Sequence, residues 1–141
     1  MKFVANGFVT EMPEGWQDRS MITMVGPATV SGFAPNAVIM REQVSTRTSI
    51  EDYAARQRLL TAREIPDLEV LDERPTTVNG APAFQRLQRF TSQGRRLQQA
   101  QTYVLGDAVV FVITCTAALE QFNESTPAFR HIVDHFQLPA A

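Results

Sequence analysis

The stretch "EVLDERPTTVNGAPAFQRLQRFTSQGRRLQQAQTYVLGDAVVFVIT", residues 69–114, decides the fold because turn signals divide it into extended segments. Asn79-Gly80 is a strong two-residue hairpin signal, Ser92-Gln93-Gly94 turns the chain back, and Gly106-Asp107 makes another tight turn. The segments beside these turns are predicted to be strands: Glu69–Val78, Ala83–Thr91, Arg96–Leu105 and Ala108–Thr116. The sequence therefore predicts a four-stranded antiparallel meander.

Three shorter strands and two helices are predicted outside this meander. Phe3–Thr10, Ser20–Val25 and Ala37–Glu42 have the composition of strands. Helices packed beside an antiparallel sheet make an α+β fold, here with a sheet of about six to seven strands and two main helices. The length of 141 residues is typical of one domain, so we expect residues 1–141 to fold as a single domain.

The boundaries of both helices can be predicted from capping residues and prolines. Thr48 or Ser49 is followed three residues later by an acidic residue, which indicates a capping box. This first helix is expected to stop before Pro66, because the residue before a proline prefers an extended backbone. The second helix occupies much of Leu119–Phe136, where Pro127 predicts either a break or a first-turn position.

Two predicted strands are too apolar for a sheet with one face in water. Ala108–Thr114 is apolar at every position except the last, and Ala37–Met40 breaks the usual alternation in the same way. Both faces of these strands are therefore expected to be covered. Either the helices lie on both sides of the sheet, or they cover one face and leave an open apolar face for a partner or a second subunit.

Charge and motifs argue against several functional classes. The net charge is −2, which is not typical of a nucleic-acid binder. Arg86, Arg89, Arg95 and Arg96 lie close together and are interpreted as the solvated surface of a hairpin rather than a basic patch. The sequence has no Gly-x-Ser-x-Gly motif, phosphate-binding loop or cysteine cluster, so we expect neither catalysis nor a cofactor.

Metal binding, disulfide formation and export are not expected either. His131 and His135 lie four residues apart, but no third ligand is evident, so we interpret them as solvent-facing. Cys115 is the only cysteine, which excludes an intrachain disulfide. The N-terminal stretch has neither a long apolar core nor a small-residue cleavage site, so we expect a cytoplasmic protein that is not embedded in a membrane.

Short motifs that occur in order along nearly the whole chain resemble a known family. They are "PEGWQDRS" (Pro13–Ser20), "PNAVIMRE" (Pro35–Glu42), "SIEDYAARQ" (Ser49–Gln57), "VLDERP" (Val70–Pro75), "NGAPA" (Asn79–Ala83) and "FRHIVDHFQL" (Phe129–Leu138). Together they resemble the DcrB-like family, whose fold is similar to the PsbP type. They are more similar still to its Eag branch, the effector-associated chaperones of bacterial type VI secretion. DcrB itself carries a lipoprotein leader, and none is predicted here, which favours the cytosolic Eag branch.

The resemblance to the Eag branch implies a non-enzymatic homodimer. Such chaperones hold the hydrophobic N-terminal transmembrane segments of toxic effectors, often effectors that carry a PAAR or VgrG spike component. They keep these helices soluble and help to load them onto the spike. The alternative is a general DcrB- or PsbP-like accessory domain that binds a protein partner or a small apolar ligand.

Apolar residues of two strands are candidates for contact with a client helix. Ile22 and Met24 share one face of their strand, and Val38 and Met40 share one face of another. If those faces coincide, they form a platform that contains methionine, whose flexible side chain adapts to several partners. The resemblance places groove residues around Ile22, Met24 and Val38. The alternative is ordinary core packing.

Three glutamines are candidates for polar contact with the client. Gln57 falls in the middle of the inward face predicted for the first helix, where its amide bonds either to the sheet of its own chain or to a client. Gln99 and Gln101 alternate with apolar residues on one face of a predicted strand. The resemblance places a client-contacting glutamine in each element, at Gln57 and at Gln101 or its neighbour Gln99.

Overall fold

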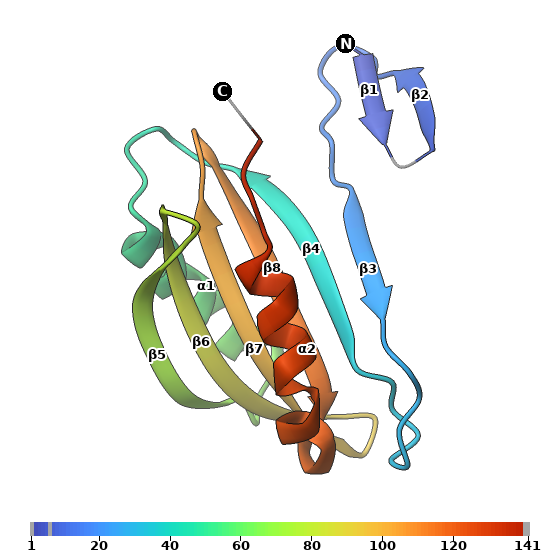
Figure 1. Cartoon of the computed structure of the whole chain (residues 1–141). Helices are drawn as coiled ribbons and strands as arrows, with labels where there is room; N and C mark the ends of the chain where they lie inside the picture. Colours follow the sequence, from blue (N-terminus) through green and yellow to red (C-terminus); the bar gives the residue numbers. More distant parts are fainter. Residues whose placement is uncertain (1, 6, 140–141) are drawn as a thin grey trace.

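The predicted meander forms the larger part of an antiparallel sheet. A computed structural model describes residues 2–5 and 7–139. Its larger sheet has six strands in the order β3-β4-β8-β7-β6-β5, and β1 and β2 form a separate hairpin (Figure 1). The α+β class predicted from the sequence is confirmed. The elements are β1 (Lys2–Ala5), β2 (Phe8–Glu11), β3 (Met21–Val25), β4 (Asn36–Gln43), α1 (Ile50–Glu64), β5 (Glu69–Val78), β6 (Ala81–Ser92), β7 (Arg95–Leu105), β8 (Val109–Ala118), a 3-10 turn (Leu119–Gln121) and α2 (Phe122–Asp134).

The two tightest turns of the meander have the backbone conformation that their sequences predict. Asn79 and Gly80 have φ angles of 47° and 83°, and Gln93 and Gly94 have φ angles of 51° and 75°. Positive φ at both central residues is the signature of the type I′ turn, whose twist matches that of the flanking strands. These turns set the register of the meander, in which Val78 pairs with Ala81.

The N-terminal segment differs from its prediction. The expected single strand over Phe3–Thr10 is instead the hairpin of β1 and β2, in which Val4 pairs with Val9. Gly7, with φ of 86°, provides the left-handed corner that ends the first strand. The hairpin lies beyond the N-terminal end of β3 and is separate from the larger sheet (Figure 1).

Helix α1 begins and ends as the sequence indicates. The Ser49 side chain accepts a hydrogen bond from the backbone N–H of Asp52 at 3.1 Å, which satisfies one of the free donors of the first turn. The helix ends at Glu64, and Ile65 before Pro66 is extended. Of the two cap residues that the sequence allowed, Ser49 is therefore the cap.

Helix α2 runs through Pro127 without the predicted break, and Pro127 is not in its first turn. Phe122 and Phe129 lie two turns apart on the same stripe of the helix, and both are buried against the sheet. Their ring centroids are 5.7 Å apart. Pro127 removes one backbone hydrogen bond from the helix. Burial of the stripe against the sheet stabilises the helix despite this loss.

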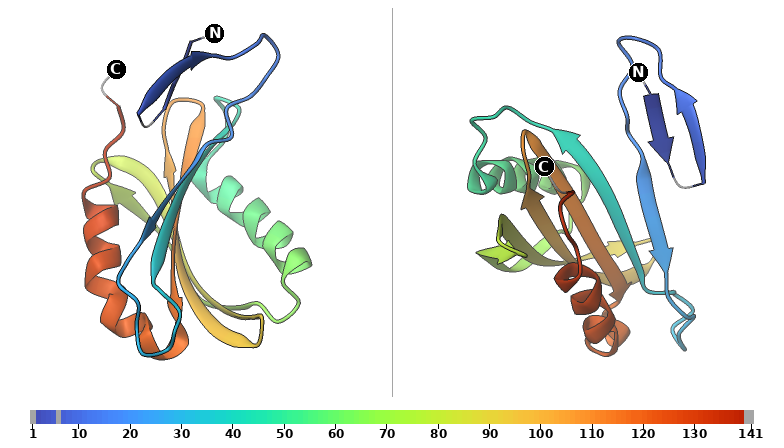
Figure 2. Two further views of the ribbon diagram at one scale, coloured as in Figure 1. Left: turned by 90° about the vertical axis from the view of Figure 1, so that its right-hand side faces the viewer. Right: turned by 45° about the horizontal axis from the view of Figure 1, so that its top comes forward.

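The helices lie on opposite faces of the sheet, as Figure 2 shows. On one face, Tyr53 of α1 packs in a cluster with Tyr103 and Val112. On the other face, Phe129 of α2 packs in a cluster with Ile113. Of the two arrangements considered for the apolar strands, helices on both sides is therefore correct. Each helix still covers only part of its face, because α1 contacts β6 and β7 and α2 contacts β8.

Candidate functional site

The register of β3 and β4 assigns their exposed residues to two faces. Thr23 pairs with Val38 and Met21 pairs with Met40, and Val38 in turn pairs with Thr114 of β8. Directly paired residues of antiparallel strands share a face, and this face carries α1. We call it the α1-side surface. Its residues are Met21, Thr23, Val25, Val38, Met40, Gln57, Gln99, Gln101 and Thr114.

Ile22 and Met24 lie on the other face of the sheet. Ile22 pairs with Ile39 and Met24 pairs with Ala37, and Ala37 is buried in the cluster beneath α2. The platform that would combine these residues with Val38 and Met40 therefore does not form. A shift of one residue in pairing moves every side chain of a strand to the opposite face, and the sequence does not specify this register.

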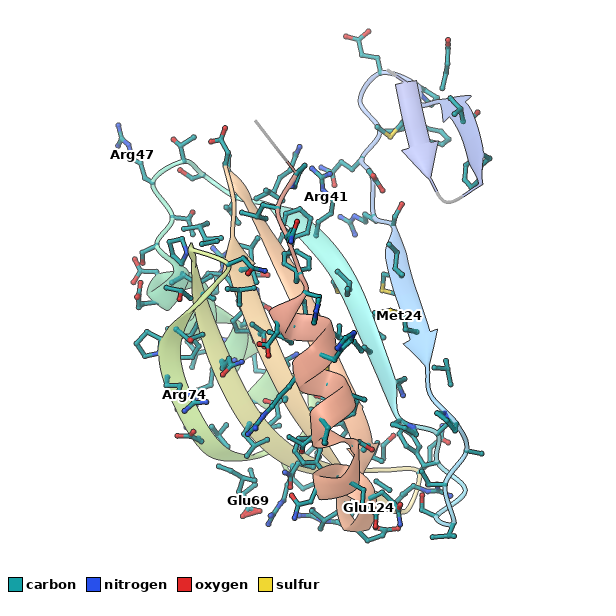
Figure 3. All side chains as sticks on the ribbon, viewed as in Figure 1. Met24, Arg41, Arg47, Glu69, Arg74 and Glu124 are labelled. Atoms are coloured by element: carbon teal, nitrogen blue, oxygen red, sulfur yellow. The ribbon has the colours of Figure 1, made fainter. Side chains whose placement is uncertain are left out.

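Strand β3 is open to solvent on both faces. Met21 and Ile22, which point to opposite faces, are 61% and 57% exposed, and Met40 beside Met21 is 41% exposed. Val38 is half-buried. Figure 3 shows Met24 on β3, at the edge of the sheet that lies far from Arg74 on β5. Ordinary core packing therefore does not account for the apolar residues of β3.

A groove of about 450 Å³ lies beside α2, between this helix and the chain around the end of β3. Met24, Pro27, Phe129 and Ile132 give it an apolar lining, and Gln121 adds an amide. A second cavity of about 230 Å³ lies between α2 and the sheet, where apolar residues such as Leu87, Phe122 and Phe129 line it. Charged residues of β5 and α2 also line this cavity: Asp72, Arg74, Arg130 and Asp134. Of the predicted site residues, Met24 lines the first of these spaces.

The glutamines of β7 take part in hydrogen bonds on the α1-side surface. Gln101 Oε1 accepts a hydrogen bond from the Tyr103 hydroxyl at 2.8 Å, and Gln101 Nε2 donates to Thr114 Oγ1 at 3.3 Å. Gln99 Oε1 accepts from Nε2 of the buried Gln88 at 2.9 Å. Gln99 and Gln101 are both half-buried, so each combines contacts to its own chain with access to solvent.

Gln57 lies on α1, one helical turn beyond the residues that contact β6 and β7. Proceeding along α1, Tyr53 meets Tyr103, and the carbonyl of Ala54 meets Arg86, which pairs with Gln101. Gln57 follows one helical turn later on the same stripe and is half-buried. The inward face predicted for α1 is buried only in its first half, because Leu60 is 44% exposed.

Arg86 is an important residue whose environment differs from the prediction. It was expected on a solvated surface with Arg89, Arg95 and Arg96, yet it is only 2% exposed. Its guanidinium donates to Glu73 Oε1 at 2.9 Å, to the Tyr103 hydroxyl at 2.8 Å and to the Ala54 carbonyl at 2.6 Å. The alternation of side chains along the strand could have predicted this burial, because Arg86 shares its face with two phenylalanines, Phe84 and Phe90.

Tyr103 beside Arg86 and Tyr53, whose ring packs on that of Tyr103, stay protonated over the physiological pH range. Burial raises the pKa of the Tyr103 hydroxyl, although the nearby Arg86 opposes this effect. Burial and a hydrogen bond to Glu42 raise the pKa of Tyr53 as well, and the Tyr53 hydroxyl donates to Glu42 Oε1 at 2.8 Å. Both hydroxyls can therefore act as hydrogen-bond donors on the α1 side.

The histidine pair at the end of α2 lies in solvent, as predicted. His131 and His135 are both exposed, with ring centroids 4.1 Å apart, and His135 Nδ1 lies 2.8 Å from the His131 carbonyl oxygen. In the part of the chain that the structure describes, no cluster of three or more His, Cys, Asp or Glu residues is arranged to hold a metal ion. Over the same residues, neither helix has the length and apolar character needed to cross a membrane.

Comparisons with known proteins agree with the motifs in the sequence. The DcrB family model matches residues 10–135. A relative named Effector EagT6, from Pseudomonas aeruginosa PAO1, is 23% identical over 120 residues, which cover 85% of this chain and 83% of the relative.

Solved structures share the fold at low sequence identity. The crystal structure of PA94, a protein of unknown function from Pseudomonas aeruginosa, has a TM-score of 0.86 and 20% identity, covering 100% of this chain and 98% of the other. The solution structure of cyanobacterial PsbP from Synechocystis sp. PCC 6803 has a TM-score of 0.63 and 9% identity, covering 99% and 92%. LpqN of Mycobacterium tuberculosis, described as involved in cell envelope biogenesis, has a TM-score of 0.57 and 12% identity, covering 87% and 85%.

These comparisons confirm the resemblance recognised in the sequence, including the likeness to the PsbP type of fold. The family match extends over the whole of the larger sheet and both α-helices. The chain belongs to the DcrB family.

Proposed function

We propose that this protein is a cytoplasmic chaperone of type VI secretion. It binds the hydrophobic N-terminal transmembrane segments of an effector that is linked to a PAAR or VgrG spike component, and it aids loading of that effector onto the spike. The likeness to Effector EagT6 supports an association with effectors. Its activity is binding rather than catalysis, and it needs no cofactor.

The observation that carries this proposal is the mixed character of the α1-side surface. Val38 and Met40 supply apolar area beside β3, and Gln99 and Gln101 lie on the same face, part of which is covered by α1, the helix that carries Gln57. A transmembrane helix needs apolar cover, worth about 25 cal/mol per Å² of buried surface, and partners for its occasional polar atoms. This surface offers both kinds of contact.

Ile22 and Met24 contact client on the opposite face in this proposal. They are exposed at the same edge of the sheet, and Met24 opens into the apolar groove beside α2. An effector with more than one hydrophobic segment can therefore place one segment on each face. The two methionines, Met24 and Met40, let both surfaces adapt to different side chains.

The two edges of the large sheet support a homodimer formed through β3. The edge strand β5 contains Pro75 and several charged residues, which are features that prevent pairing with another strand. The edge strand β3 reads "MITMV" and has neither a proline nor a charge. Pairing of β3 with β3 of a second copy would join two α1-side surfaces into one wider surface.

The dimer is tested by light scattering after size-exclusion chromatography. We expect a mass of two chains, each of 15.7 kDa. Val25→Lys places a charge on the exposed edge strand and is expected to give monomers. A wild-type monomer, or a dimer that persists in Val25→Lys, contradicts association through β3.

Co-expression tests the chaperone function itself. The probe is the N-terminal hydrophobic segment of a type VI secretion effector that carries a PAAR or VgrG component, fused to a soluble reporter. We expect the fusion to be insoluble alone and soluble with this protein, and Gln57→Ala with Gln101→Ala to reduce its capture. A fusion that is soluble by itself, or that stays insoluble with the chaperone, rejects the function.

A second candidate function is suited to the groove beside α2. Its volume of about 450 Å³ falls in the range of small-molecule sites, about 300–1,000 Å³. An accessory domain that binds a small apolar ligand would use Met24, Phe129 and Ile132. Titration with the fluorescent probe 1-N-phenylnaphthylamine tests this function. Binding that is lost in Ala128→Trp, which fills the groove, favours it over the chaperone function.

A further inference from the structure

Two histidines one helical turn apart lie at the end of α2. His131 and His135 are exposed, their ring centroids are 4.1 Å apart, and the ring planes are inclined by 35°. Residues four apart on a helix are neighbours on its surface, so both rings project from one face. Two nitrogen ligands of one metal ion, each about 2.0–2.1 Å from it, lie about 3 Å apart. A small rotation of these two side chains therefore brings them to the spacing of a chelate.

A hydrogen bond to the backbone fixes the tautomer of His135. Its Nδ1 lies 2.8 Å from the carbonyl oxygen of His131. A carbonyl oxygen only accepts, so Nδ1 must carry a proton, and in the neutral ring the free lone pair is then on Nε2. Histidines that bind metals almost always donate their other ring N–H to a carboxylate, a backbone carbonyl or water. His135 thus has the supporting hydrogen bond that is typical of a metal ligand.

Contacts from the sheet hold the helix end that carries this pair. Helix ends commonly fray. Here the Asn79 side chain, in the turn between β5 and β6, donates to the carbonyl of Asp134 at 3.1 Å and also to the carbonyl of Phe136. The Phe136 ring packs on Phe111 of β8, with the ring centroids 5.5 Å apart. Because the backbone is already held, binding an ion costs little further conformational freedom.

The donor set indicates which ions can bind. Among the described residues no group of three or more His, Cys, Asp or Glu side chains could hold a metal, so a closed structural zinc site is not formed. Two imidazoles are enough for an exposed ion that keeps water in its other positions. Imidazole suits copper, nickel and zinc, and the affinity of one site for divalent ions rises from cobalt through nickel to copper and falls again at zinc.

We infer that His131 and His135 form a binding site for a divalent transition-metal ion, with copper(II) bound most tightly. The ion takes Nε2 of His135, a ring nitrogen of His131 and water in its other positions. It bridges two successive turns and requires the helical backbone, so it binds the folded chain and stabilises the end of α2. This site lies outside the surfaces used in the proposed chaperone function and does not depend on that function.

Isothermal titration of the untagged full chain with copper(II), nickel(II) and zinc(II) tests the site. We expect one ion per chain and affinities in the order copper, nickel, zinc. His131→Ala and His135→Ala should each weaken copper binding by more than about tenfold, because even the loss of a supporting partner of a ligand costs about 10–100-fold. Nickel(II) should raise the urea concentration at the midpoint of unfolding in the wild type and in neither variant.

A variant with the same number of histidines is the matched control. His131→Ala combined with Ala128→His places the two histidines seven residues apart, about 10 Å along the helix, which is too far for one ion. It should bind copper no better than His131→Ala alone. Both positions are exposed, and circular dichroism checks that the variants are folded. In nitrogen-15 nuclear magnetic resonance spectra, zinc(II) should shift the Nε2 signal of His135 far more than its Nδ1 signal.

Four outcomes overturn the inference. A wild-type chain that binds none of the three ions has no such site. Undiminished copper affinity in either alanine variant shows that the ion is bound elsewhere. Wild-type affinity in the control with displaced histidines shows that single imidazoles bind without chelation. One ion per two chains shows a bridge between copies instead of a site within one helix. None of these results bears on the capture of a client, so the chaperone function is tested separately.

Discussion

Ile22 of β3 and Val38 of β4 lie on opposite faces of the sheet, although their strands are hydrogen-bonded neighbours. Ile22 pairs with Ile39, and Val38 pairs with Thr23. The apolar groups at this edge therefore form two surfaces rather than one. A charge introduced on one surface leaves the other intact, so the two can be tested separately.

Single aspartate substitutions should separate the two faces. Val38→Asp is expected to weaken capture of a client with one hydrophobic helix by about tenfold or more, because helix binding would bury the new charge. Ile22→Asp should leave capture of that client unchanged. With a client of two hydrophobic helices, each substitution is expected to weaken capture.

Pull-down with quantified stoichiometry measures these effects, and circular dichroism checks that both variants are folded. Both substitutions replace one aliphatic residue by aspartate, so each serves as the control for the other. Equal losses with the client of one helix would show that the faces do not act separately.

Glu73 should stabilise the fold through Arg86. The buried guanidinium loses its charged partner in Glu73→Gln, and hydrogen bonds to charged groups are worth about 1.5–3 kcal/mol. We therefore expect the free energy of unfolding in urea to fall by about 2 kcal/mol. The neighbouring Asp72→Asn, at an exposed position, should change it by less than about 0.5 kcal/mol. Equal changes in the free energy of unfolding for Glu73→Gln and Asp72→Asn would mean that the ion pair does not stabilise the fold.

The cap of α1 can be tested in the same way. Ser49→Ala removes the hydroxyl that accepts from the Asp52 N–H, and loss of such a cap costs about 1 kcal/mol. Thr48→Ala is the matched control, because Ser49 rather than Thr48 caps the helix. Urea unfolding of both variants measures the difference, and a larger effect at Thr48 would contradict this assignment.

The Cys115 thiol should resist modification in the folded protein. Burial raises its pKa from 9.0 to about 11, so at pH 8 only about one thiol in a thousand is ionised. Reaction with Ellman's reagent at pH 8 is expected to be slow in buffer and rapid in urea. Fast reaction in buffer would show that the strand opens.

The same shift predicts how stability depends on pH. Between pH 9 and about 11 the unfolded chain releases the Cys115 proton while the folded chain retains it, so stability falls as the pH rises through this window. Cys115→Ala should lose less stability than the wild type between pH 8.5 and pH 10.5, a range chosen to span most of it. If the free energy of unfolding falls with pH at the same rate in the wild type and in Cys115→Ala, the raised pKa of Cys115 is contradicted.

Local chemistry in the sequence predicts the strands of the meander and their turns. Asn79-Gly80 places positive φ angles at consecutive residues, and this alone determines a hairpin and its register. The N-terminal hairpin carries the same type of signal at Asn6-Gly7, which the sequence interpretation missed in favour of one strand. Strands with clear turn residues are therefore predictable without tertiary information.

The arrangement of the candidate site was less predictable, because it depends on pairing between distant segments. Val38, Met40, Gln57, Gln99 and Gln101 come to one face, whereas Ile22 and Met24 come to the other. The long connection between β3 and β4 does not determine their register in the way that a two-residue turn does. The burial of Arg86 likewise depends on Glu73 and Tyr103, which reach it from other strands.

The unequal edges of the large sheet limit how far association can proceed. If two copies join through β3, the edge strand of each copy that can pair with another strand is used up. The outer strands of the resulting sheet are then both β5, where Pro75 hinders the pairing of a further strand. Growth then stops at a closed pair instead of continuing into a fibre. In the proposed function, apolar surface stays exposed until a client binds, and this limit on association would prevent the protein from polymerising.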